Sequence, residues 1–265
     1  MRHAQRTVPR WAIVLGASSG FGGATAKELA RAGYDIAGVH LDRANRMPIV
    51  EEIKADIEAA GHRAWYFNVN ANDDEQRIEV LDTIEEDIEE NGGTVAVLMH
   101  SLAFGTLKPY IGENVITKRN MHMTMDVMAH SLVFWAQDLV QRGLMHEGGR
   151  IFSMTSAGST RVISAYGAVS AAKSALESHT RQLAMELAPY GVTVNALRGG
   201  VTRTPAAERI PESDKLFLEA VQRNPHKRLT TPEDVAKAVV ALCKPGTDWI
   251  TGNVINVDGG EEVSG

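Results

Sequence analysis

Tyr166 and Lys173 are the two residues whose types and spacing most strongly suggest chemistry. They lie seven positions apart in an alanine-rich segment, residues 164–176, which predicts a helix because alanine is the strongest helix former. A helix turns by about 100° per residue, so this spacing makes almost two full turns and places both side chains on one face. Packing alone explains such a pair poorly. A half-buried tyrosine beside a solvated lysine is the alternative when the pair is considered in isolation.

A glycine-rich turn near the start of the chain indicates a nucleotide site. Gly16, Gly20 and Gly22 stand between an apolar run, residues 11–15, and a predicted helix, residues 23–32. Glycines in such a turn let a pyrophosphate approach backbone N–H groups at the helix N-terminus. The spacing is Gly-x-x-x-Gly-x-Gly, whereas Gly-x-Gly-x-x-Gly is commoner. A merely tight turn is the alternative, but the position after the first strand favours nucleotide binding.

The end of the second predicted strand should lie near the adenosine ribose of that nucleotide. An acidic residue there binds the ribose diol of NAD, whereas a basic residue pairs with the 2′-phosphate of NADP. The chain has His40 at this position, followed by Asp42 and Arg43. Asp42 fits a diol, Arg43 fits a phosphate, and both could instead be solvated turn residues. We expect NADPH over NADH by a small margin, and we expect Asn68, at the end of the third strand, to contact the adenine edge.

Alternating apolar strands and helices define the predicted fold. Strands are expected at residues 11–15, 34–40, 63–69, 95–100, 150–154, from 191 onward and at 253–257, with helices at 23–32, 47–60, 73–90, 118–142, 164–189 and 231–243. Such alternation is typical of βαβ units, whose parallel sheet is covered by helices on both faces. We therefore expect one α/β domain over residues 1–265, a Rossmann-type doubly wound fold with a seven-stranded parallel sheet. Residues 1–10 are expected to form a flexible N-terminus.

Composition and charge exclude several classes of protein. The chain has 265 residues, of which 44% are hydrophobic and 23% charged, as in ordinary globular domains. A net charge of −6 argues against general nucleic-acid binding. The single cysteine, Cys243, excludes an internal disulfide framework, and no residues have metal-ligand spacing. No apolar run approaches the length of a membrane span, and residues 1–10 lack the apolar core of a secretory signal, so we expect a cytoplasmic protein.

In their order along the chain, these motifs resemble the short-chain dehydrogenase/reductase family. The matching segments, which together span nearly the whole chain, are the turn at 16–22, the segment with Tyr166 and Lys173, Asn195-Ala-Leu-Arg-Gly-Gly200 and Val257-Asp-Gly-Gly260. The resemblance implies the same fold and a nicotinamide cofactor.

The chain departs from the commonest members of that family at the residues used for carbonyl reduction. Those members have a tyrosine four positions before the lysine, where this chain has Val169. Ser156 occupies the usual serine position, whereas Met128 aligns with the usual asparagine. The fourth strand ends in His100-Ser-Leu-Ala103 where the family has Asn-Asn-Ala-Gly. The apparatus for carbonyl reduction is thus partly missing.

The wider Tyr-x6-Lys spacing resembles one subgroup, the enoyl-acyl-carrier-protein reductases of fatty-acid synthesis. The segment 100–104 and the pair Gly199-Gly200 are also similar to motifs of that subgroup. One branch has a second active-site tyrosine ten residues before the first, where this chain has Ser156, so the match to that branch is incomplete.

The shifted tyrosine suits reduction of a carbon–carbon double bond. In a ketone, the hydride adds to the carbon that carries the oxygen. In a 2-enoyl thioester it adds to the β carbon, and negative charge develops on an oxygen two carbons away. Moving the tyrosine by three helical residues shifts its Cα by about 4.5 Å along the axis, because the rise is about 1.5 Å per residue.

The resemblance implies roles for individual residues. Lys173 would hold the nicotinamide ribose and lower the pKa of Tyr166 through its charge. Tyr166 would donate a hydrogen bond to the developing enolate oxygen. Ser156 would add a second hydrogen bond or only cap a turn, and Thr204 would contact the carboxamide or only form a turn with Pro205. The residues implied to bind the cofactor are Gly16, Ser18, Ser19, Gly20, Phe21, Gly22, His40, Asp42, Arg43, Asn68, Val69, Ser101, Leu102, Ala103, Lys173, Gly199, Gly200, Val201 and Thr204.

Residues 199–225 are expected to form the substrate lid. Seven basic and four acidic residues between Arg198 and Arg228 make this region more basic than the rest of the chain. A basic lid would steer an acidic acyl carrier protein, although a solvated face is the alternative. We expect an acyl-carrier or CoA thioester substrate and, by analogy with the family, a homotetramer.

Some residues have structural interpretations, and two other functions also fit the sequence. His100 is expected to be a local hydrogen-bonding residue, and the methionines around Met128 are expected to pack in the core or between subunits. A short-chain ketone or alcohol oxidoreductase of β-ketoacyl or hydroxysteroid type is the first alternative function, favoured by Ser156 and opposed by Val169. A non-catalytic, dinucleotide-binding redox sensor is the second, and the intact pair of Tyr166 and Lys173 opposes it.

Overall fold

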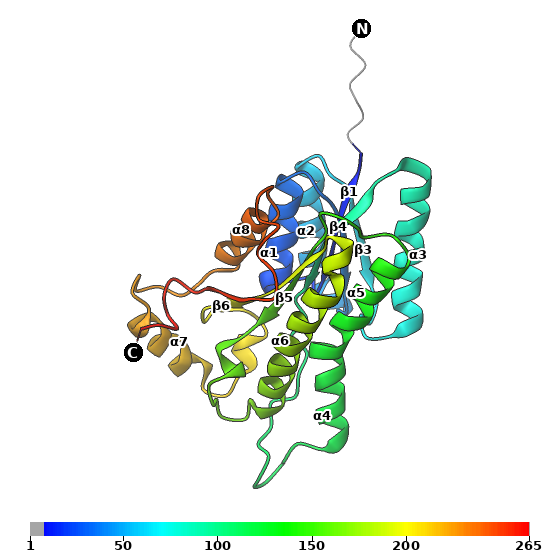
Figure 1. Ribbon diagram of the computed structural model, residues 1–265. Coiled ribbons are helices and arrows are strands. Elements are labelled where there is room, and N and C mark those ends of the chain that lie inside the picture. Colours follow the sequence, from blue (N-terminus) through cyan, green and yellow to red (C-terminus); the bar gives the residue numbers. More distant parts are fainter. Residues whose placement is uncertain (1–7, 265) are drawn as a thin grey trace.

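A seven-stranded parallel sheet forms the centre of the computed structural model, which describes residues 8–264 (Figure 1). In space the strands follow the order β3, β2, β1, β4, β5, β6, β7, and every neighbouring pair is parallel. They are β1 (Arg10–Leu15), β2 (Asp35–His40), β3 (Ala64–Asn68), β4 (Thr94–His100), β5 (Arg150–Thr155), β6 (Thr193–Gly199) and β7 (Val254–Val257). The chain order reverses between β1 and β4, which is the topological switch point of a doubly wound fold.

Helices cover both faces of the sheet. They are α1 (Gly20–Arg31), α2 (Met47–Ala59), α3 (Asp74–Asn91), α4 (Lys118–Met125), α5 (Ser131–Gln141), α6 (Gly167–Leu187), α7 (Ser213–Arg223) and α8 (Pro232–Leu242). One apolar core joins the sheet to α3, α5 and α6, and a second joins it to α1, α2 and α8, as the two helical layers in Figure 1 show. The predicted single Rossmann-type domain is confirmed.

Local signals explain most of the element boundaries. The sequence Thr-Pro-Glu-Asp at 231–234 forms a capping box, in which the Thr231 hydroxyl accepts a hydrogen bond from the Asp234 N–H at 3.2 Å. Helix α8 begins there as predicted and ends beside Cys243. Burial raises the pKa of the Cys243 thiol to about 11, which fits an inert structural cysteine.

The structure corrects the predicted start of the helix that carries Lys173. Helix α6 begins at Gly167, so Tyr166 is its N-cap residue and not an interior residue. Ala165 has φ of +58°, a left-handed conformation that a right-handed helix cannot contain. Alanine-rich composition predicted helix from residue 164 because it carries no information about this backbone reversal.

Two other predicted boundaries change in ways that matter for the site. Helix α1 begins at Gly20, three residues before the predicted start, so the glycine-rich turn supplies the first helical turn. The single helix expected at 118–142 is α4 and α5 joined by a π-helical segment, Asp126–His130. Such wide turns often occur at functional sites, and Met128 within it lines the pocket described below.

The expected flexible N-terminus is tested only in part. Residues 1–7 and 265 lie outside the described residues, but Arg10 already belongs to β1. Among the described residues no helix is long and apolar enough to cross a membrane.

Candidate active site

A pocket of about 440 Å³ opens at the carboxyl ends of β4, β5 and β6. It brings together residues that are far apart in the chain. The predicted site residues that line it are Phe21, Ser101, Leu102, Ala103, Ser156, Tyr166, Lys173, Gly199, Gly200, Val201 and Thr204. Apolar side chains, including Leu107, Met128 and Val169, form another part of its wall. The pocket therefore has polar groups at the strand ends and an apolar space beside them, which suits a ligand with both characters.

The turn between β1 and α1 has the geometry of a phosphate cradle. A Cβ on Gly16 would lie 2.5 Å from the Ser101 carbonyl oxygen, and a Cβ on Gly22 would lie 2.1 Å from the Gly16 carbonyl oxygen. Only glycine therefore fits at both positions. The N-cap side chain of α1, Ser19, makes no capping hydrogen bond, and the first turn has no acidic residue. Because the first N–H groups of a helix lack intrahelical partners, this end is open to a dinucleotide pyrophosphate.

The ends of β2 and β3 form a hydrogen-bonded corner beside this cradle. The His40 side chain is buried, and its Nδ1 lies 3.1 Å from an Asp42 carboxylate oxygen. Arg46 Nε lies 3.2 Å from the other Asp42 oxygen. The Asn68 amide accepts from the Asp42 N–H at 2.9 Å and donates to its carbonyl at 3.0 Å.

Both polar partners of Asp42 at this corner hold it in place. Asn68 uses its amide to hold the backbone of Asp42, and the His40 ring contacts the Asp42 carboxylate. The cofactor contacts expected of His40 and Asn68 stay predictions. Arg43 is exposed and takes part in none of the ion pairs among the described residues. It is thus the basic side chain that remains available to a ligand at this corner.

Lys173 is buried, with 5% of its surface exposed, although it carries a charge. Its Nζ donates to the carbonyl oxygen of Met154 at 2.6 Å and to that of Leu102 at 3.5 Å, at the ends of β5 and β4. Burial lowers the pKa of Lys173 to about 8, and the charge of Glu177 opposes this shift. Since Nζ has three protons and these carbonyls accept two, one remains for a ligand in the pocket.

Tyr166, the N-cap residue of α6, lines the pocket together with Ser156. Its ring packs on Gly158, where a Cβ would come within 2.5 Å of Tyr166 Cε1. Ser156 Oγ accepts from the Gly158 N–H at 3.0 Å and so caps the turn Ala157–Ser159. This bond leaves the Ser156 hydroxyl proton free, and a hydrogen bond from Ser156 acts to lower the pKa of Tyr166.

The expected effect of Lys173 on Tyr166 is wrong in this structure. Burial raises the pKa of Tyr166, and within the described part of the chain Ser156 alone opposes this shift. Tyr166 therefore stays protonated near neutral pH and can donate a hydrogen bond. The sequence could place the lysine on the same face, but it could not show how deeply the phenol is buried.

His100 is a local hydrogen-bonding residue, as predicted. It is fully buried, and its Nε2 lies 2.8 Å from Ser131 Oγ, which in turn donates to the Val127 carbonyl at 2.8 Å. Burial, with a smaller effect from Lys173, lowers the pKa of His100 to about 3. The imidazole is thus neutral at physiological pH. Through Ser131 it supports the π-helical segment that contains Val127.

Thr204 has a structural part in the turn that follows β6. Its hydroxyl oxygen accepts from the Ala207 N–H at 3.1 Å, and its methyl group would lie 3.4 Å from a Cβ on Gly20. The hydroxyl proton is still free, so the bond with Ala207 does not exclude a contact with a ligand.

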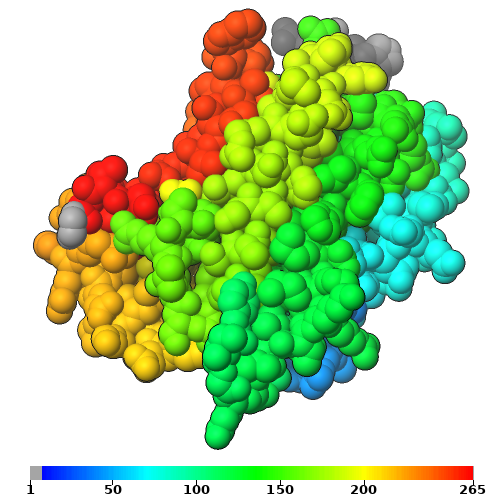
Figure 2. Space-filling view, turned by 60° about the horizontal axis from the view of Figure 1, so that its bottom comes forward, coloured from blue at the N-terminus to red at the C-terminus, as the bar shows by residue number. Residues whose placement is uncertain are grey.

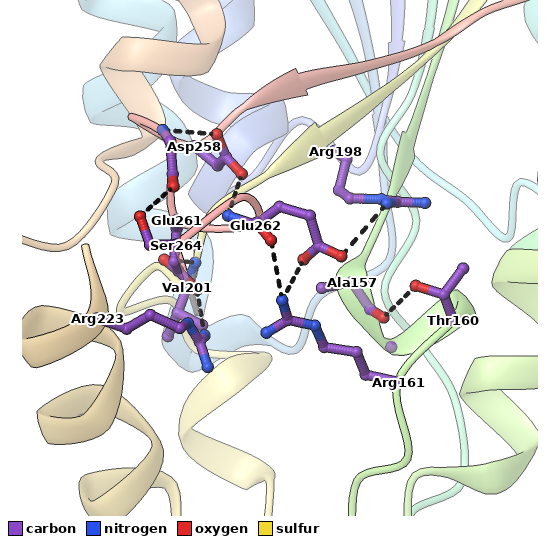
Figure 3. Close-up of polar contacts among 12 residues, drawn as sticks. Ala157, Thr160, Arg161, Arg198, Val201, Arg223, Asp258, Glu261, Glu262 and Ser264 are labelled. Atoms are coloured by element: carbon purple, nitrogen blue, oxygen red, sulfur yellow. Dashed lines mark hydrogen bonds and ion pairs between the residues drawn. The ribbon is translucent and has the colours of Figure 1, made fainter. Parts of the chain in front are cut away.

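The C-terminal residues also line the pocket, which the sequence did not predict. Glu261 accepts from Arg223 of α7 at 2.7 Å and from the Val201 N–H at 3.1 Å, whereas Glu262 lies 3.1 Å from Arg161 (Figure 3). In the space-filling view the C-terminal segment, in red, lies beside the yellow and orange segment that contains α7 (Figure 2). Two adjacent glutamates after a Gly-Gly pair could have indicated a functional segment. Nothing in the sequence showed which arginines would lie beside them.

Replacing Gly158 with alanine should lower kcat about tenfold with little change in dinucleotide affinity. The new Cβ would displace the Tyr166 ring, and small displacements of a reacting group reduce rates strongly. Steady-state kinetics and cofactor titration would measure both values. Thr160→Ala, an exposed change in the adjoining loop, is the matched control. An unchanged kcat in Gly158→Ala would show that the position of the ring does not matter.

Comparison with known proteins agrees with this geometry. Residues 16–262 match the family described as enoyl-(acyl carrier protein) reductase. The chain belongs to the enoyl-acyl-carrier-protein reductase-like short-chain dehydrogenases/reductases. It is 29% identical over 233 residues to an NADH-dependent enoyl-acyl-carrier-protein reductase of Bacillus cereus, covering 88% of this chain and 86% of that protein.

Other members of this reductase family are similar over almost their whole length. A 1-cyclohexenylcarbonyl-CoA reductase of Streptomyces collinus is 28% identical over 262 residues, covering 97% of this chain and 89% of that protein. The crystal structure of an enoyl-acyl-carrier-protein reductase (NADH) from Aquifex aeolicus superposes with a TM-score of 0.82 at 26% identity, covering 97% of each chain. The protein is therefore an oxidoreductase of this family, and the phosphate cradle fits the nicotinamide cofactor that the family uses.

Proposed function

We propose that this reductase reduces the 2,3 double bond of enoyl thioesters, with Tyr166 and Lys173 as catalytic residues. The observation that carries the proposal is the position of Tyr166. It precedes α6 and lies seven residues before the buried Lys173, whereas Val169, at the spacing used for ketones, is a buried apolar residue. Both Tyr166 and Lys173 line one pocket that has apolar space for an acyl chain.

Each polar group has a task that its environment supports. The reduced nicotinamide, when bound, supplies the hydride that adds to the β carbon. Lys173 uses its remaining N–H to donate a hydrogen bond to a ribose hydroxyl and so orients the cofactor. Tyr166, kept protonated by burial, donates to the thioester oxygen as negative charge develops there. Ser156 donates to the Tyr166 oxygen and strengthens the phenol as a donor. The enolate then takes up a proton at its α carbon, which completes the reduction.

The cofactor is held along the edge formed by the ends of β1, β2, β4 and β6. We assign the pyrophosphate to the first turn of α1, the adenosine ribose to the corner of Asp42 and Arg43, and the carboxamide to the segment 199–204. Thr204 would donate to the carboxamide while its oxygen caps the following turn. Residues 199–225 act as the substrate lid in this proposal.

NADPH is the proposed cofactor, because the Asp42 carboxylate already has partners in His40 and Arg46, whereas Arg43 forms no ion pair with any residue that the structure describes. Replacing Arg43 with glutamine should weaken NADPH binding about tenfold and leave NADH binding unchanged, since one charge-assisted contact to the 2′-phosphate is lost. Titration of both dinucleotides by fluorescence measures this. Arg31→Gln, on the exposed side of α1, is the control. Equal loss of both affinities would contradict the assignment.

An acyl carrier protein or coenzyme A would present the thioester. Of the seven basic residues between Arg198 and Arg228, five form ion pairs with carboxylates of residues 8–264, and the exceptions within that range are Arg209 and Lys227. The lid is thus less positive than its composition suggests. If Arg209 and Lys227 steer an acidic carrier, turnover of enoyl-carrier should fall with salt more steeply than turnover of enoyl-CoA. Identical salt dependence would remove the steering role.

Assembly into a homotetramer belongs to the same proposal. Helices α5 and α6 each expose a large apolar side chain, Phe134 and Met185, which a second copy would cover. Light scattering of the purified protein measures the mass directly, and a monomer would contradict this part.

Cofactor oxidation with two substrates tests the function. The purified chain with NADPH or NADH should oxidise the cofactor with crotonyl-CoA and not with acetoacetyl-CoA. Activity with acetoacetyl-CoA alone would support the second candidate, a ketone reductase, which the contact between Ser156 and Tyr166 favours. Failure with both substrates would leave a dinucleotide-binding protein without catalysis.

A further inference from the structure

We propose that the buried ion pair of Glu177 and Arg198 is the positioning element of the active site: Glu177 keeps Lys173 charged, and Arg198 braces the turn that carries Ser156. The inference rests on the proposed role of Lys173 in holding the cofactor. It adds two residues that touch neither the substrate nor the cofactor in that proposal.

Glu177 lies one helical turn after Lys173 on the inward face of α6. The residue is 9% exposed, and its carboxylate accepts from the Thr155 hydroxyl at 2.7 Å and from Arg198 at 3.2 Å. Thr155 and Arg198 are paired neighbours on β5 and β6, so their side chains leave the same face of the sheet. The carboxylate is therefore fixed over the carboxyl ends of these strands.

Glu177 is the carboxylate whose charge acts on Lys173. Burial lowers the pKa of Lys173 to about 8, and among the described residues only Glu177 opposes this shift. Of the other titratable groups near the ammonium, His100 is neutral because its pKa is lowered to about 3, and Tyr166 is neutral because its pKa is raised. The positive charge of Arg198 is balanced by Glu177 and, at 3.9 Å, by Glu262.

Arg198 extends the effect to the other half of the site. Its guanidinium donates to Ser159 Oγ at 3.3 Å, and Ser174 of α6 donates to the Ser159 carbonyl at 3.0 Å. Both bonds fix the turn Ala157–Ser159, whose N-cap residue is Ser156. Arg198 also faces Glu262, which binds Arg161 on the loop after this turn (Figure 3). One network thus supports both Lys173 and the surface on which the Tyr166 ring rests.

The pH dependence of cofactor binding tests this role. For the wild-type chain, the dissociation constant of the reduced dinucleotide should rise above about pH 8, where Lys173 loses its proton. In Glu177→Gln this rise should begin about one pH unit lower, because an opposite charge near a lysine is lost. Glu186→Gln, an exposed change on the same helix, should titrate like wild type. A purely structural role would lower affinity at every pH without moving the titration.

Two further variants make the test independent of folding defects and of the reaction. Arg198→Gln should not move the titration to lower pH, because Glu177 keeps its charge. The double variant Glu177→Gln/Arg198→Gln leaves no unpaired buried charge between these partners. Its dissociation constant for the reduced dinucleotide should begin to rise at a lower pH than that of wild type.

A double-mutant cycle in unfolding needs no substrate. Lys173→Met and Glu177→Gln should have non-additive effects on the denaturation midpoint of the cofactor-free protein. Additive effects, or a Glu177→Gln titration that matches wild type, would overturn the inference. Absence of enoyl reduction with the coupling intact would overturn only the proposed function.

Discussion

Replacing Tyr166 with phenylalanine should reduce kcat for enoyl-thioester reduction by about 10²–10³-fold, the typical effect of removing one oxyanion donor. The phenol is the group placed to meet the thioester oxygen, and burial keeps it protonated. Only the hydroxyl is removed, so the ring should still pack on Gly158. Dinucleotide affinity should therefore stay within about twofold, since Lys173 and the phosphate cradle are untouched.

Parallel kinetics on Tyr190→Phe, which alters an exposed tyrosine beyond the end of α6, control for loss of a phenol elsewhere. Crotonyl-CoA turnover and cofactor binding by fluorescence provide the two readouts. A Tyr166→Phe enzyme with wild-type kcat would show that another group stabilises the enolate. A large loss of cofactor affinity would instead show that the residue is structural.

Replacing Lys173 with methionine should raise the dinucleotide dissociation constant about 10- to 100-fold at pH 7, since a hydrogen bond from a charged group is worth about 1.5–3 kcal/mol. It should also change how stability depends on pH. Burial lowers the pKa of Lys173 from 10.5 to about 8, so the folded state binds this proton less tightly than the unfolded state. The resulting destabilisation is fully present below pH 8 and is relieved as the pH rises toward 10.5.

The free energy of unfolding of the wild type minus that of Lys173→Met should therefore increase by roughly 2 kcal/mol between pH 7 and pH 10. Denaturant unfolding of the cofactor-free proteins measures the difference. Lys237→Met, which removes an exposed lysine on α8 away from the pocket, is the control for loss of a lysine elsewhere. A flat difference for Lys173→Met would mean that its ammonium is not desolvated in the fold.

Local sequence determined the architecture of this protein because its signals are short-range. Apolar strands alternating with amphipathic helices require a parallel sheet covered on both faces, and that fold is present. The glycines at 16, 20 and 22 predicted a tight turn before a helix, and backbone atoms indeed lie within 2.5 Å of where a Cβ would stand on Gly16 and Gly22. The spacing of Tyr166 and Lys173 predicted a shared site, and both line one pocket.

Some errors came from backbone reversals and long-range burial, which leave little trace in a local pattern. Ala165 in the left-handed region keeps α6 from starting before Gly167, although the composition of residues 164–166 favours helix. Burial, rather than Lys173, sets the direction of the Tyr166 pKa shift. The hydrogen bonds of Asn68 to the backbone of Asp42, 26 residues away in the chain, likewise left no trace in the sequence.

Tertiary structure alone decided which charged groups around the pocket contact one another. Glu177, Arg198 and Glu262 come from α6, β6 and the C-terminal segment, and only folding brings Arg198 within 4 Å of both carboxylates. In the sequence such residues look like the many solvated charges, because desolvation and distance, on which the interaction depends, are not visible there. The residue types of the catalytic pair were thus fixed by sequence, whereas the electrostatic environment that controls their protons was fixed by the packing of α6 against β5 and β6.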